Sequence, residues 1–446
     1  MKPSATLMNT VANLANSLEE HWMPFTANRH FKTNPRLMTG AEGMYYTTDR
    51  GDKVIDGSAG LFCVAAGHGR PEIADAVGRT LREMDYVPPF QYGHPVSFEL
   101  SRRLAALTPG DLNYMFFVNS GSEAVDSALK ISLAYHRARG EGQRMRLVGR
   151  ERAYHGVNFG GVSVAGLVNN RKAFGLGLPG VLHLRHTLLP EHRFTLGQPE
   201  TGAELAGDLQ RFVDLHGAES IAACIVEPIA GSTGCLVPPK GYLDRLREIC
   251  DRHHILLIFD EVICAFGRTG KQFAADSFEV VPDMITMAKA LTNGVVPMGA
   301  VACSGKIYET ITAAAPETSI ELFHGHTYSG CPVASAAALA TRDIFETEGL
   351  VERAGKMSPE FLAALYSLRD LPVVTDIRGY GMLGGVDLAP REAPGARGFA
   401  VLQELYAAGL MVKVTGDCVL LSPPLICEET HIDEIFTKLR GVLKGH

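Results

Sequence analysis

The sequence lacks several features, and each absence narrows the function classes. It has no C-x-x-C pair, no G-x-x-x-x-G-K-[ST] phosphate loop, and no apolar run near the roughly 20 residues that a membrane span requires. Its nine cysteines are odd in number and scattered along the chain. This usage predicts reduced, mostly buried thiols instead of a disulfide framework.

Basic residues are also fewer than acidic residues. The chain has 42 Lys and Arg residues against 49 Asp and Glu residues, which gives a formal net charge of -7. That balance leaves no electrostatic footprint for nucleic acid or for an anionic membrane. Residues 1–22 contain Asn, Ser and Glu where a signal peptide needs a continuous apolar segment. We therefore expect a cytoplasmic protein.

The rest of the composition is that of an ordinary globular protein. Of the 446 residues, 46% are hydrophobic and 20% are charged, and a chain of this length predicts two or more packed lobes. We predict a large domain over residues 66–330 and a smaller α+β domain over residues 331–446. An N-terminal segment, residues 1–65, is expected to join the smaller domain.

Short apolar runs alternate with amphipathic stretches through the middle of the chain. Strands that are apolar on both faces and are separated by helices predict an α/β fold with a mostly parallel sheet. After residue 330 a long helix (332–350) and then a helix with antiparallel strands (364–389) are expected. The predicted strands of the large sheet are 114–118, 222–228, 255–262, 284–288 and 299–304.

Three small residues, Ser120, Gly121 and Ser122, lie between the first predicted strand and the helix that follows it. The first N–H groups of a helix have no internal partner and the helix dipole favours an anion, so this turn is a candidate phosphate site. Ordinary helix capping is the alternative, because Ser120 and Glu123 have the S-x-x-E spacing of a capping box.

Two acids, Asp260 and Glu261, end another buried strand. Ligands bind at the carboxyl ends of parallel strands. A carboxylate there can hold Mg²⁺, pair with a protonated ring nitrogen, or simply be a solvated acid at a strand end. The nucleotide version of a metal site needs the missing phosphate loop, so no metal site is predicted.

Two further patterns are interpreted as structural. The G-x-G-x-x-G spacing at Gly379, Gly381 and Gly384 is followed by a predicted strand instead of a helix, which indicates a hairpin turn and not a dinucleotide site. His324 and His326 lie two residues apart, but no third ligand stands at zinc spacing. A packing role is therefore expected for both histidines.

One lysine stands in an unusually apolar setting. Lys289 lies in "MITMAKALTNGVVPMG", residues 284–299. Lysine is rarely fully buried without a partner for its amine. Lys289 either reaches water from a strand end or is held in a dry site, where its amine can form a Schiff base with a carbonyl compound.

Together these features specify one ligand. An anion site at residues 120–122, a carboxylate at Asp260 and an amine at Lys289 match a molecule with a phosphate, a basic ring nitrogen and an aldehyde. Pyridoxal 5'-phosphate (PLP) has all three groups. The sequence therefore predicts PLP as the cofactor.

Several longer motifs resemble the class III aminotransferases of the fold-type I PLP enzymes. They are "YHGVN", "VEPIAGSTG", "LIFDEVICAFGRTG", "MAKALTNGVVPMGAV" and "HGHTYSG", and the resemblance runs over nearly the whole chain. "HWMPFTANRHF", "FQYGHP" and "HTLLPEHRF" resemble the omega-amino acid:pyruvate (β-alanine:pyruvate) group. The fold implied is the fold-type I PLP-dependent transferase fold, with a mostly parallel large domain and a smaller α+β domain.

The resemblance also implies roles for individual residues. Lys289 would bind the cofactor's aldehyde covalently and then move the proton, and Asp260 would pair with the ring nitrogen. Tyr154 would stack on one face of the ring and Val262 on the other. His155, which follows Tyr154 in the sequence, would also contact the cofactor. The remaining implied cofactor contacts are Ser120, Gly121 and Ser122 at the phosphate, Glu227 near Asp260, and Thr327, which would reach the cofactor of a second subunit.

The sequence departs from the resemblance in the implied substrate pocket. That pocket would contain Phe25, Phe62, Phe90 and Lys413. Phe62 stands where close relatives have Trp, and Lys413 stands where they have an Arg that grips the substrate carboxylate. Ile263 replaces a Gln of many relatives. Arg offers a planar fork and Lys only a point charge, so weaker selection for carboxylated donors is expected.

The implied reaction is transfer of an amino group from an ω-amino acid such as β-alanine, or from a simple amine, to pyruvate. Alanine and an aldehyde or oxo product would result. A mutase, racemase or decarboxylase of the same fold would use the same lysine and aspartate, and a non-enzymatic binding protein also stays open. The resemblance further implies a homodimer with its sites at the interface, with pairing into tetramers left open.

Overall fold

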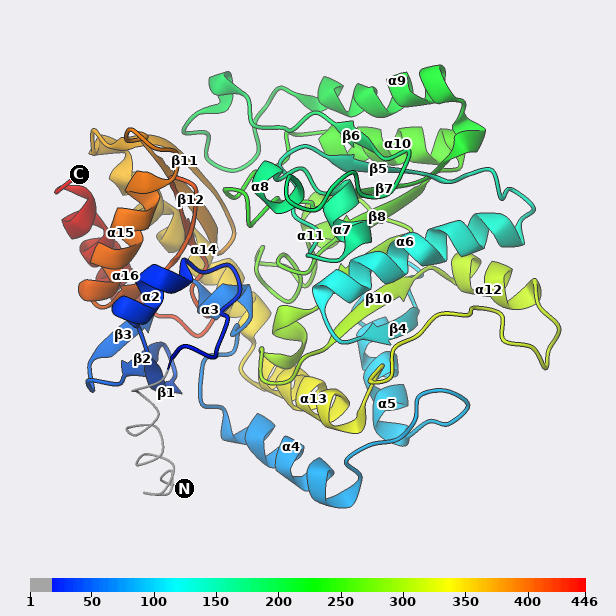
Figure 1. The fold of residues 1–446 in the computed structure, drawn as a ribbon, viewed down its shortest axis with the longest axis horizontal. Helices are drawn as coiled ribbons and strands as arrows, with labels where there is room; N and C mark the ends of the chain where they lie inside the picture. Colours follow the sequence, from blue (N-terminus) through cyan, green and yellow to red (C-terminus); the bar gives the residue numbers. More distant parts are fainter. Residues whose placement is uncertain (1–17) are drawn as a thin grey trace.

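The computed structural model describes residues 18–446, so the first 17 residues of the predicted N-terminal segment lie outside it. Within this range the chain forms one seven-stranded sheet and two four-stranded sheets, with helices packed around them (Figure 1). The seven strands are, in spatial order, β4 (Tyr114–Val118), β10 (Gly299–Cys303), β9 (Met284–Met287), β8 (Leu256–Asp260), β7 (Ile221–Val226), β5 (Arg146–Arg150) and β6 (Leu182–Leu184).

The large sheet is mostly parallel, as the sequence predicts. Neighbouring strands from β9 to β6 run parallel, whereas β10 is antiparallel to both β9 and β4. All five predicted strands are present. Strands β5 and β6 are not among the predicted strands, because β5 begins and ends with arginine and β6 spans only three residues.

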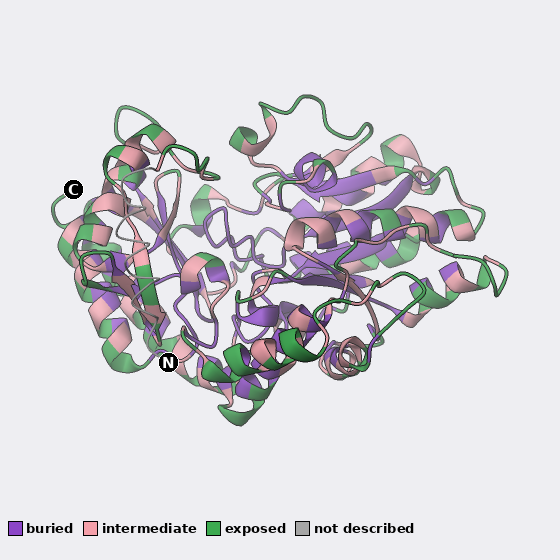
Figure 2. Cartoon of the chain, turned by 60° about the horizontal axis from the view of Figure 1, so that its bottom comes forward, coloured by how far each residue is buried: buried purple, intermediate pink, exposed green. Residues whose placement is uncertain are grey.

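Alternation along the strands gives the sheet two apolar faces. Leu257 and Phe259 of β8 belong to one core, while Leu256 and Ile258 belong to the other, because successive side chains of a strand point to opposite faces. Helix α6 covers the second face and α10 the first. Figure 2 shows the buried strands between helices whose outer surfaces are exposed. The sheet is thus held rigid from both sides, and its strand ends are fixed in space.

The helices surround these sheets. The α-helices are α2 (Asn28–Thr33), α3 (Ala59–Phe62), α4 (Pro71–Glu83), α5 (Pro95–Ala105), α6 (Gly121–Ala138), α7 (Phe159–Val164), α8 (Val168–Arg171), α9 (Gly207–His216), α10 (Tyr242–His253), α11 (Ala274–Phe278), α12 (Gly305–Ala313), α13 (Pro332–Thr347), α14 (Leu350–Tyr366), α15 (Ala396–Ala407) and α16 (Glu429–Leu443). The 3₁₀ turns are η1 (Pro190–His192), η2 (Ala203–Ala206), η3 (Ala218–Ser220), η4 (Lys289–Thr292) and η5 (Ser367–Asp370). The predicted helix over 332–350 ends at Thr347, because Gly349 has a φ of +58°.

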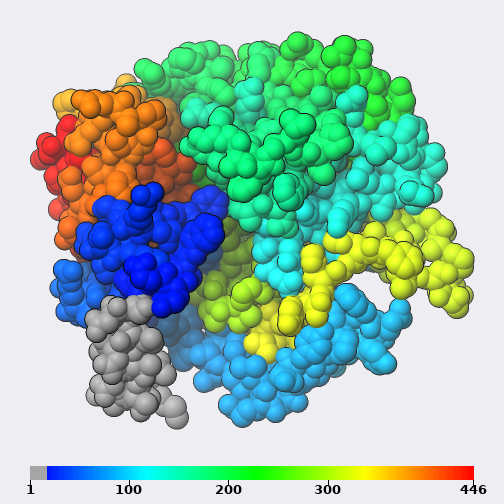
Figure 3. Space-filling model, in the orientation of Figure 1, coloured from blue at the N-terminus to red at the C-terminus, as the bar shows by residue number. Residues whose placement is uncertain are grey.

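One of the two small sheets joins the N-terminal and C-terminal parts of the chain, and the other contains C-terminal strands alone. One has the order β1 (Met38–Glu42), β2 (Tyr45–Thr48), β3 (Lys53–Asp56) and β13 (Leu410–Met411), and β13 runs parallel to β3. The other has the order β11 (Val374–Tyr380), β12 (Leu383–Leu388), β15 (Cys418–Leu421) and β14 (Lys413–Thr415). Figure 3 shows the N-terminal part in blue against the C-terminal part in orange. The proposed domain limits at residues 65 and 330 stay predictions.

Two smaller predictions are confirmed. Gly379 pairs with Gly384 across the antiparallel hairpin of β11 and β12, with Gly381 (φ +60°) in the turn, so the glycine pattern forms a hairpin. All nine cysteines are free, and seven of them are buried.

None of the helices within residues 18–446 is both long and apolar enough to span a membrane.

Candidate active site

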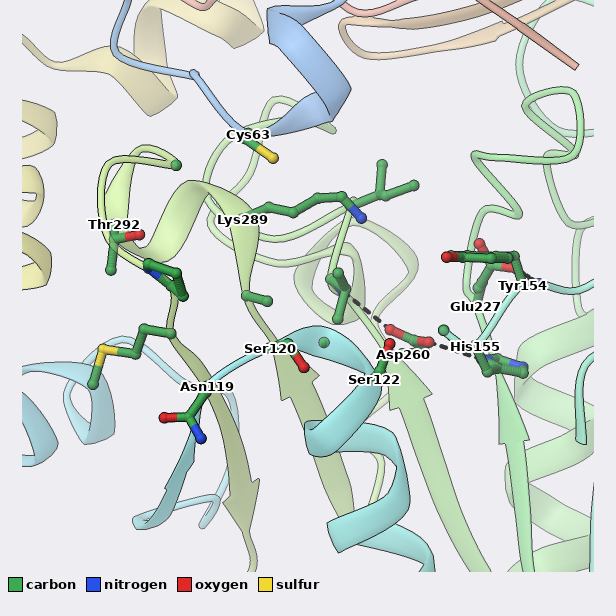
Figure 4. Close-up of a pocket in the computed structure, with 18 of the residues that line it drawn as sticks. Cys63, Asn119, Ser120, Ser122, Tyr154, His155, Glu227, Asp260, Lys289 and Thr292 are labelled. Carbon is green, nitrogen blue, oxygen red and sulfur yellow. Dashed lines mark hydrogen bonds and ion pairs between the residues drawn. The ribbon is translucent and has the colours of Figure 1, made fainter. Parts of the chain in front are cut away.

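A cavity of about 320 Å³ opens at the carboxyl ends of β8 and β9, beside the N-terminus of α6 (Figure 4). Asp260 ends β8, and Lys289 begins η4, which follows β9 directly in the chain. Every predicted cofactor-binding residue except Thr327 lines this cavity, namely Ser120, Gly121, Ser122, Tyr154, His155, Glu227, Asp260, Val262 and Lys289. The fold therefore brings together residues that lie far apart in the sequence.

The N-terminus of α6 supplies both a cap and free donors. Ser120 Oγ accepts the Glu123 N–H at 3.2 Å, which confirms the capping that the S-x-x-E spacing predicts. The reciprocal half of the box differs, because the Glu123 carboxylate accepts the Asn119 N–H at 2.7 Å and not that of Ser120. The first N–H groups of the helix, on Gly121 and Ser122, are left for an anion in the cavity.

Asp260 is held by three contacts and is only 5% exposed. His155 Nδ1 lies 2.7 Å from one carboxylate oxygen, and Nδ1 donates because an ionised carboxylate only accepts. The other oxygen accepts from Thr286 Oγ at 3.0 Å and from the Val262 N–H at 3.2 Å. Charge-assisted bonds of this kind are strong, so they fix the carboxylate at the cavity wall.

Glu227 lies behind Tyr154 and is buried. Its carboxyl oxygen accepts the Tyr154 N–H at 2.8 Å. Burial raises the pKa of Glu227 to about 7, opposed by His155 and helped by the negative charge of Asp260. Burial also raises the pKa of the Tyr154 hydroxyl, which therefore keeps its proton at neutral pH. Glu227 thus fixes the backbone that presents the Tyr154 ring to the cavity.

Replacing Glu227 with glutamine should make stability less dependent on pH. Because its pKa is raised in the folded state, Glu227 contributes stability below pH 4.5 that is lost as the pH rises through about 7. Relative to Glu227→Gln, the free energy of unfolding of the natural chain should fall by up to about 3 kcal/mol across that window. Urea unfolding of both proteins at several pH values measures the difference. A difference that stays constant with pH would contradict the assignment.

The neighbouring acid, Glu261, caps a helix instead of facing the cavity. Its two carboxyl oxygens accept the Ala274 N–H at 2.6 Å and the Ala275 N–H at 2.8 Å. These are the first N–H groups of α11 and have no partner inside that helix. Burial raises the pKa of Glu261 to about 8. Glu261 does not line the cavity, so of the two acids only Asp260 faces it.

Lys289 is the one lysine among the described residues that line the cavity. Its backbone is in the left-handed region, with φ at +49°, and the Gly294 N–H closes the turn by donating to the Lys289 carbonyl at 3.1 Å. Non-glycine residues adopt this conformation mainly where their surroundings enforce it. Figure 4 shows the amine pointing across the cavity toward the side that carries Asp260 and Tyr154.

The predicted substrate residues do not line the cavity within the single chain. Phe25 and Phe90 are 80% and 56% exposed, and Phe62 is buried. The Lys413 amine lies 6.0 Å from the centre of the Phe62 ring. Burial lowers the pKa of Lys413, and the positive charge of Lys289 lowers it further. The substrate roles of these residues stay predictions.

Several residues that shape the site were not predicted from the sequence, and two of them are instructive. Thr286 holds the Asp260 carboxylate, and Cys63 lines the cavity. Thr286 is the one polar residue in the strand sequence "MITM", which is a signal that could have been used. Cys63 reaches the cavity from a distant segment and carries no local signal.

His324 is half-buried and packs against neighbouring side chains, as its sequence context predicts. Its ring stacks on Phe116 with the ring centres 5.4 Å apart, and its Nε2 lies 2.8 Å from Ser127 Oγ. The His326 ring meets His324 edge-on. Burial lowers the pKa of His324 to about 4, so this histidine is neutral at physiological pH.

The class-III aminotransferase family model matches residues 26–443. The chain belongs to the class-III aminotransferases. An omega-aminotransferase from Caulobacter vibrioides is 54% identical to it over 431 residues, covering 96% of this chain and 98% of that protein. A beta-alanine–pyruvate aminotransferase from Pseudomonas aeruginosa is 48% identical over 432 residues, covering 96% of each protein.

Solved structures agree with this membership. An omega transaminase from Pseudomonas jessenii in complex with PMP has a TM-score of 0.91 and 32% identity to this aminotransferase, covering 97% of both chains. The predicted fold-type I architecture and the predicted resemblance are confirmed, and the chain is a PLP-dependent enzyme.

The cavity of this aminotransferase fits PLP. His155 Nε2 is buried without a partner in the described part of the chain, and the leading N–H groups of α6 face the cavity. The cradle is also tight, because a Cβ atom added to Gly121 would lie 3.0 Å from Val262, and one added to Gly156 would lie 2.4 Å from Ser122 Oγ. The glycines therefore allow the segments that form the cradle to pack closely against each other.

Proposed function

We propose that this aminotransferase moves an amino group from an ω-amino acid of the β-alanine type, or from a simple amine, to pyruvate. The observation that carries the proposal is the convergence of Lys289, Asp260 and the α6 N-terminus on one cavity. The names of its relatives support the substrates: one is a beta-alanine–pyruvate aminotransferase and another, from Pseudomonas putida, is an omega-amino acid–pyruvate aminotransferase at 46% identity.

Each side chain then has a defined task. When bound, PLP supplies an aldehyde that takes up the amino group and a ring that spreads the electron pair of the reacting carbon. Lys289 Nζ would accept the proton from the donor carbon that bears the nitrogen. Asp260 would keep the ring nitrogen protonated, and the Gly121 and Ser122 N–H groups would bind the phosphate.

Product analysis tests this function. Incubation of the enzyme with pyruvate and a panel of amino donors should give alanine and one equivalent of aldehyde or oxo-acid from each accepted donor. A mutase, racemase or decarboxylase of the same fold would make no alanine from pyruvate. Absence of alanine with every donor would therefore overturn the proposal.

Lys413 is proposed to bind the donor carboxylate as a point charge. Replacing it with arginine should raise the ratio of kcat/KM for β-alanine over 1-phenylethylamine by roughly tenfold, because an added charge-assisted hydrogen bond contributes about 1.5 kcal/mol. Lys413→Met, which keeps the stem without the charge, is the matched control and should lower the same ratio. An unchanged ratio in both variants would rule out Lys413 as the carboxylate contact.

We further propose that the enzyme is a homodimer in which Thr327 reaches the neighbouring subunit's cofactor. Thr327 is exposed, and its carbonyl accepts from Tyr86 Oη at 3.0 Å within an exposed aromatic surface. Exposed apolar clusters of this kind mark interaction sites. Sedimentation should show a species of twice the monomer mass. The exposed aromatic residues of the two segments that this hydrogen bond joins are Tyr86, Phe90, Tyr92, Phe323 and Tyr328.

A cytoplasmic location is also proposed. It is supported by the nine free cysteines, since thiols persist in reducing compartments. Cell fractionation tests it.

A further inference from the structure

A strained segment forms part of the cavity wall. Residues 56–68 lead from the small β1–β3 sheet to the cavity and supply Cys63 to its lining. Figure 4 shows Cys63 beside the Lys289 side chain. Within this segment Ala59 and Phe62 have φ values of +46° and +63°. Such backbone persists only where surrounding contacts hold it in place.

The buried carboxylate of Asp56 bonds to residues at both ends of the segment. The two oxygens of Asp56 accept the Ser58 N–H at 3.0 Å and the Gly60 N–H at 2.7 Å. The second oxygen also lies 2.9 Å from Nε2 of His68. The beginning and the end of the segment are therefore tied to the same side chain.

A second contact, from Asn293, holds the segment against the turn that carries Lys289. Asn293 Oδ1 accepts the Ala66 N–H at 2.8 Å, and its Nδ2 donates to the Gly67 carbonyl at 2.9 Å. The Asn293 N–H donates in turn to the Ala290 carbonyl at 3.2 Å. Asn293 is only 2% exposed and does not itself line the cavity.

We propose that Asn293 is a positioning residue that fixes the Cys63 wall relative to the Lys289 amine. This inference rests on the proposed role of Lys289. The segment that carries Cys63 packs closely against the turn that follows Lys289, because a Cβ atom added to Gly294 would lie 2.9 Å from the Cys63 Cβ. Loss of the Asn293 carboxamide would let the segment with Cys63 shift relative to the cavity in which the donor binds. The turn at Lys289 would still be closed by the Gly294 N–H.

Three substitutions separate this role from backbone strain. Asn293 has a φ of +52°, which alanine tolerates poorly and glycine tolerates well. Asn293→Gly therefore removes the clamp without strain, Asn293→Ala removes it with strain, and Asn293→Asp keeps the acceptor for the Ala66 N–H but loses the donor to Gly67. We expect kcat/KM for amino donors to fall in the glycine variant by up to about 100-fold, mainly through a higher KM.

Amide hydrogen exchange of the segment gives a readout that does not depend on catalysis. In the full-length protein, with or without PLP, peptides covering residues 58–68 should exchange faster in the glycine and alanine variants, with the aspartate variant in between. If the glycine variant keeps the natural KM and the natural exchange, or loses only thermal stability, the inference is wrong. Failure of the proposed function would instead appear as missing alanine, and it would leave the exchange result unchanged.

Discussion

Replacing Lys289 with alanine is expected to lower kcat by about 10²–10⁴-fold or more, because a positioned general acid–base group contributes a factor of this size. The amine is the only one from a lysine among the described residues that line the cavity. The phosphate donors of α6 and the Asp260 carboxylate remain in place, so the variant should still bind PLP. Steady-state kinetics, with PLP content measured on the same preparation, tests both halves of this prediction.

Lys289→Arg is the matched control for this experiment. Arginine keeps the positive charge and a long stem, but it does not give up its proton in proteins, so it cannot accept one from the donor. Both variants should therefore show this large loss of kcat, and added methylamine should restore part of the rate in the alanine variant alone. Near-normal transamination by either variant would show that another group moves the proton.

Replacing Asp260 with asparagine should lower kcat by about 10²–10³-fold, the usual effect of removing one preorganised electrostatic partner. Asparagine has nearly the same shape but carries no charge. It cannot hold a proton on the ring nitrogen as a carboxylate does, so the reacting carbon loses its electron sink. The contacts from His155 and Thr286 also lose the charge that strengthens them. Rapid-mixing measurement of the first half-reaction tests this directly.

Glu261→Gln is the control for Asp260→Asn, because Glu261 is the adjacent buried acid. It bonds the first N–H groups of α11 and does not line the cavity. A glutamine has one acceptor oxygen where both carboxyl oxygens are used, so the variant should lose about 1–3 kcal/mol of unfolding free energy. Its kcat should stay close to that of the natural enzyme. Equal kcat losses in the two variants would contradict the distinction between the acids.

The chemistry of the site could be predicted because its main groups follow local signals. Lys289 and Asp260 each follow a strand whose apolar pattern is visible in the sequence, and residues 120–122 begin a helix with clear periodicity. Parallel neighbouring strands end at the same edge of a sheet. The apolar patterns of β8 and β9 therefore predict that the amine and the carboxylate lie at the same edge of the sheet.

The supporting contacts could not be predicted because they depend on strand register and long-range packing. Thr286 stands out in the sequence as the one polar residue of its strand. Its contact with Asp260, however, depends on the pairing of the two residues across β8 and β9, and an apolar pattern does not specify register. The role of Glu261 depends on a helix thirteen residues further along the chain. The Asn293 contacts join segments more than two hundred residues apart in the sequence.

The direction of β10 was beyond the sequence for a related reason. Its apolar run resembles those of the parallel strands, yet it runs antiparallel to both neighbours. Strand direction follows from the path of the connecting chain. Between β9 and β10 that path is the short turn with Lys289, with no crossover helix that a parallel pair would need. The turn that carries the amine thus also sets the direction of the strand after it.

Mapping the covalent attachment of the cofactor tests the central claim most directly. The enzyme loaded with PLP is reduced with sodium borohydride, digested, and analysed by mass spectrometry to locate the modified residue. The account predicts that the pyridoxyl group is found on Lys289 and that Lys289→Ala carries none. A label on any other lysine, or an unmodified natural enzyme under the same conditions, would contradict it.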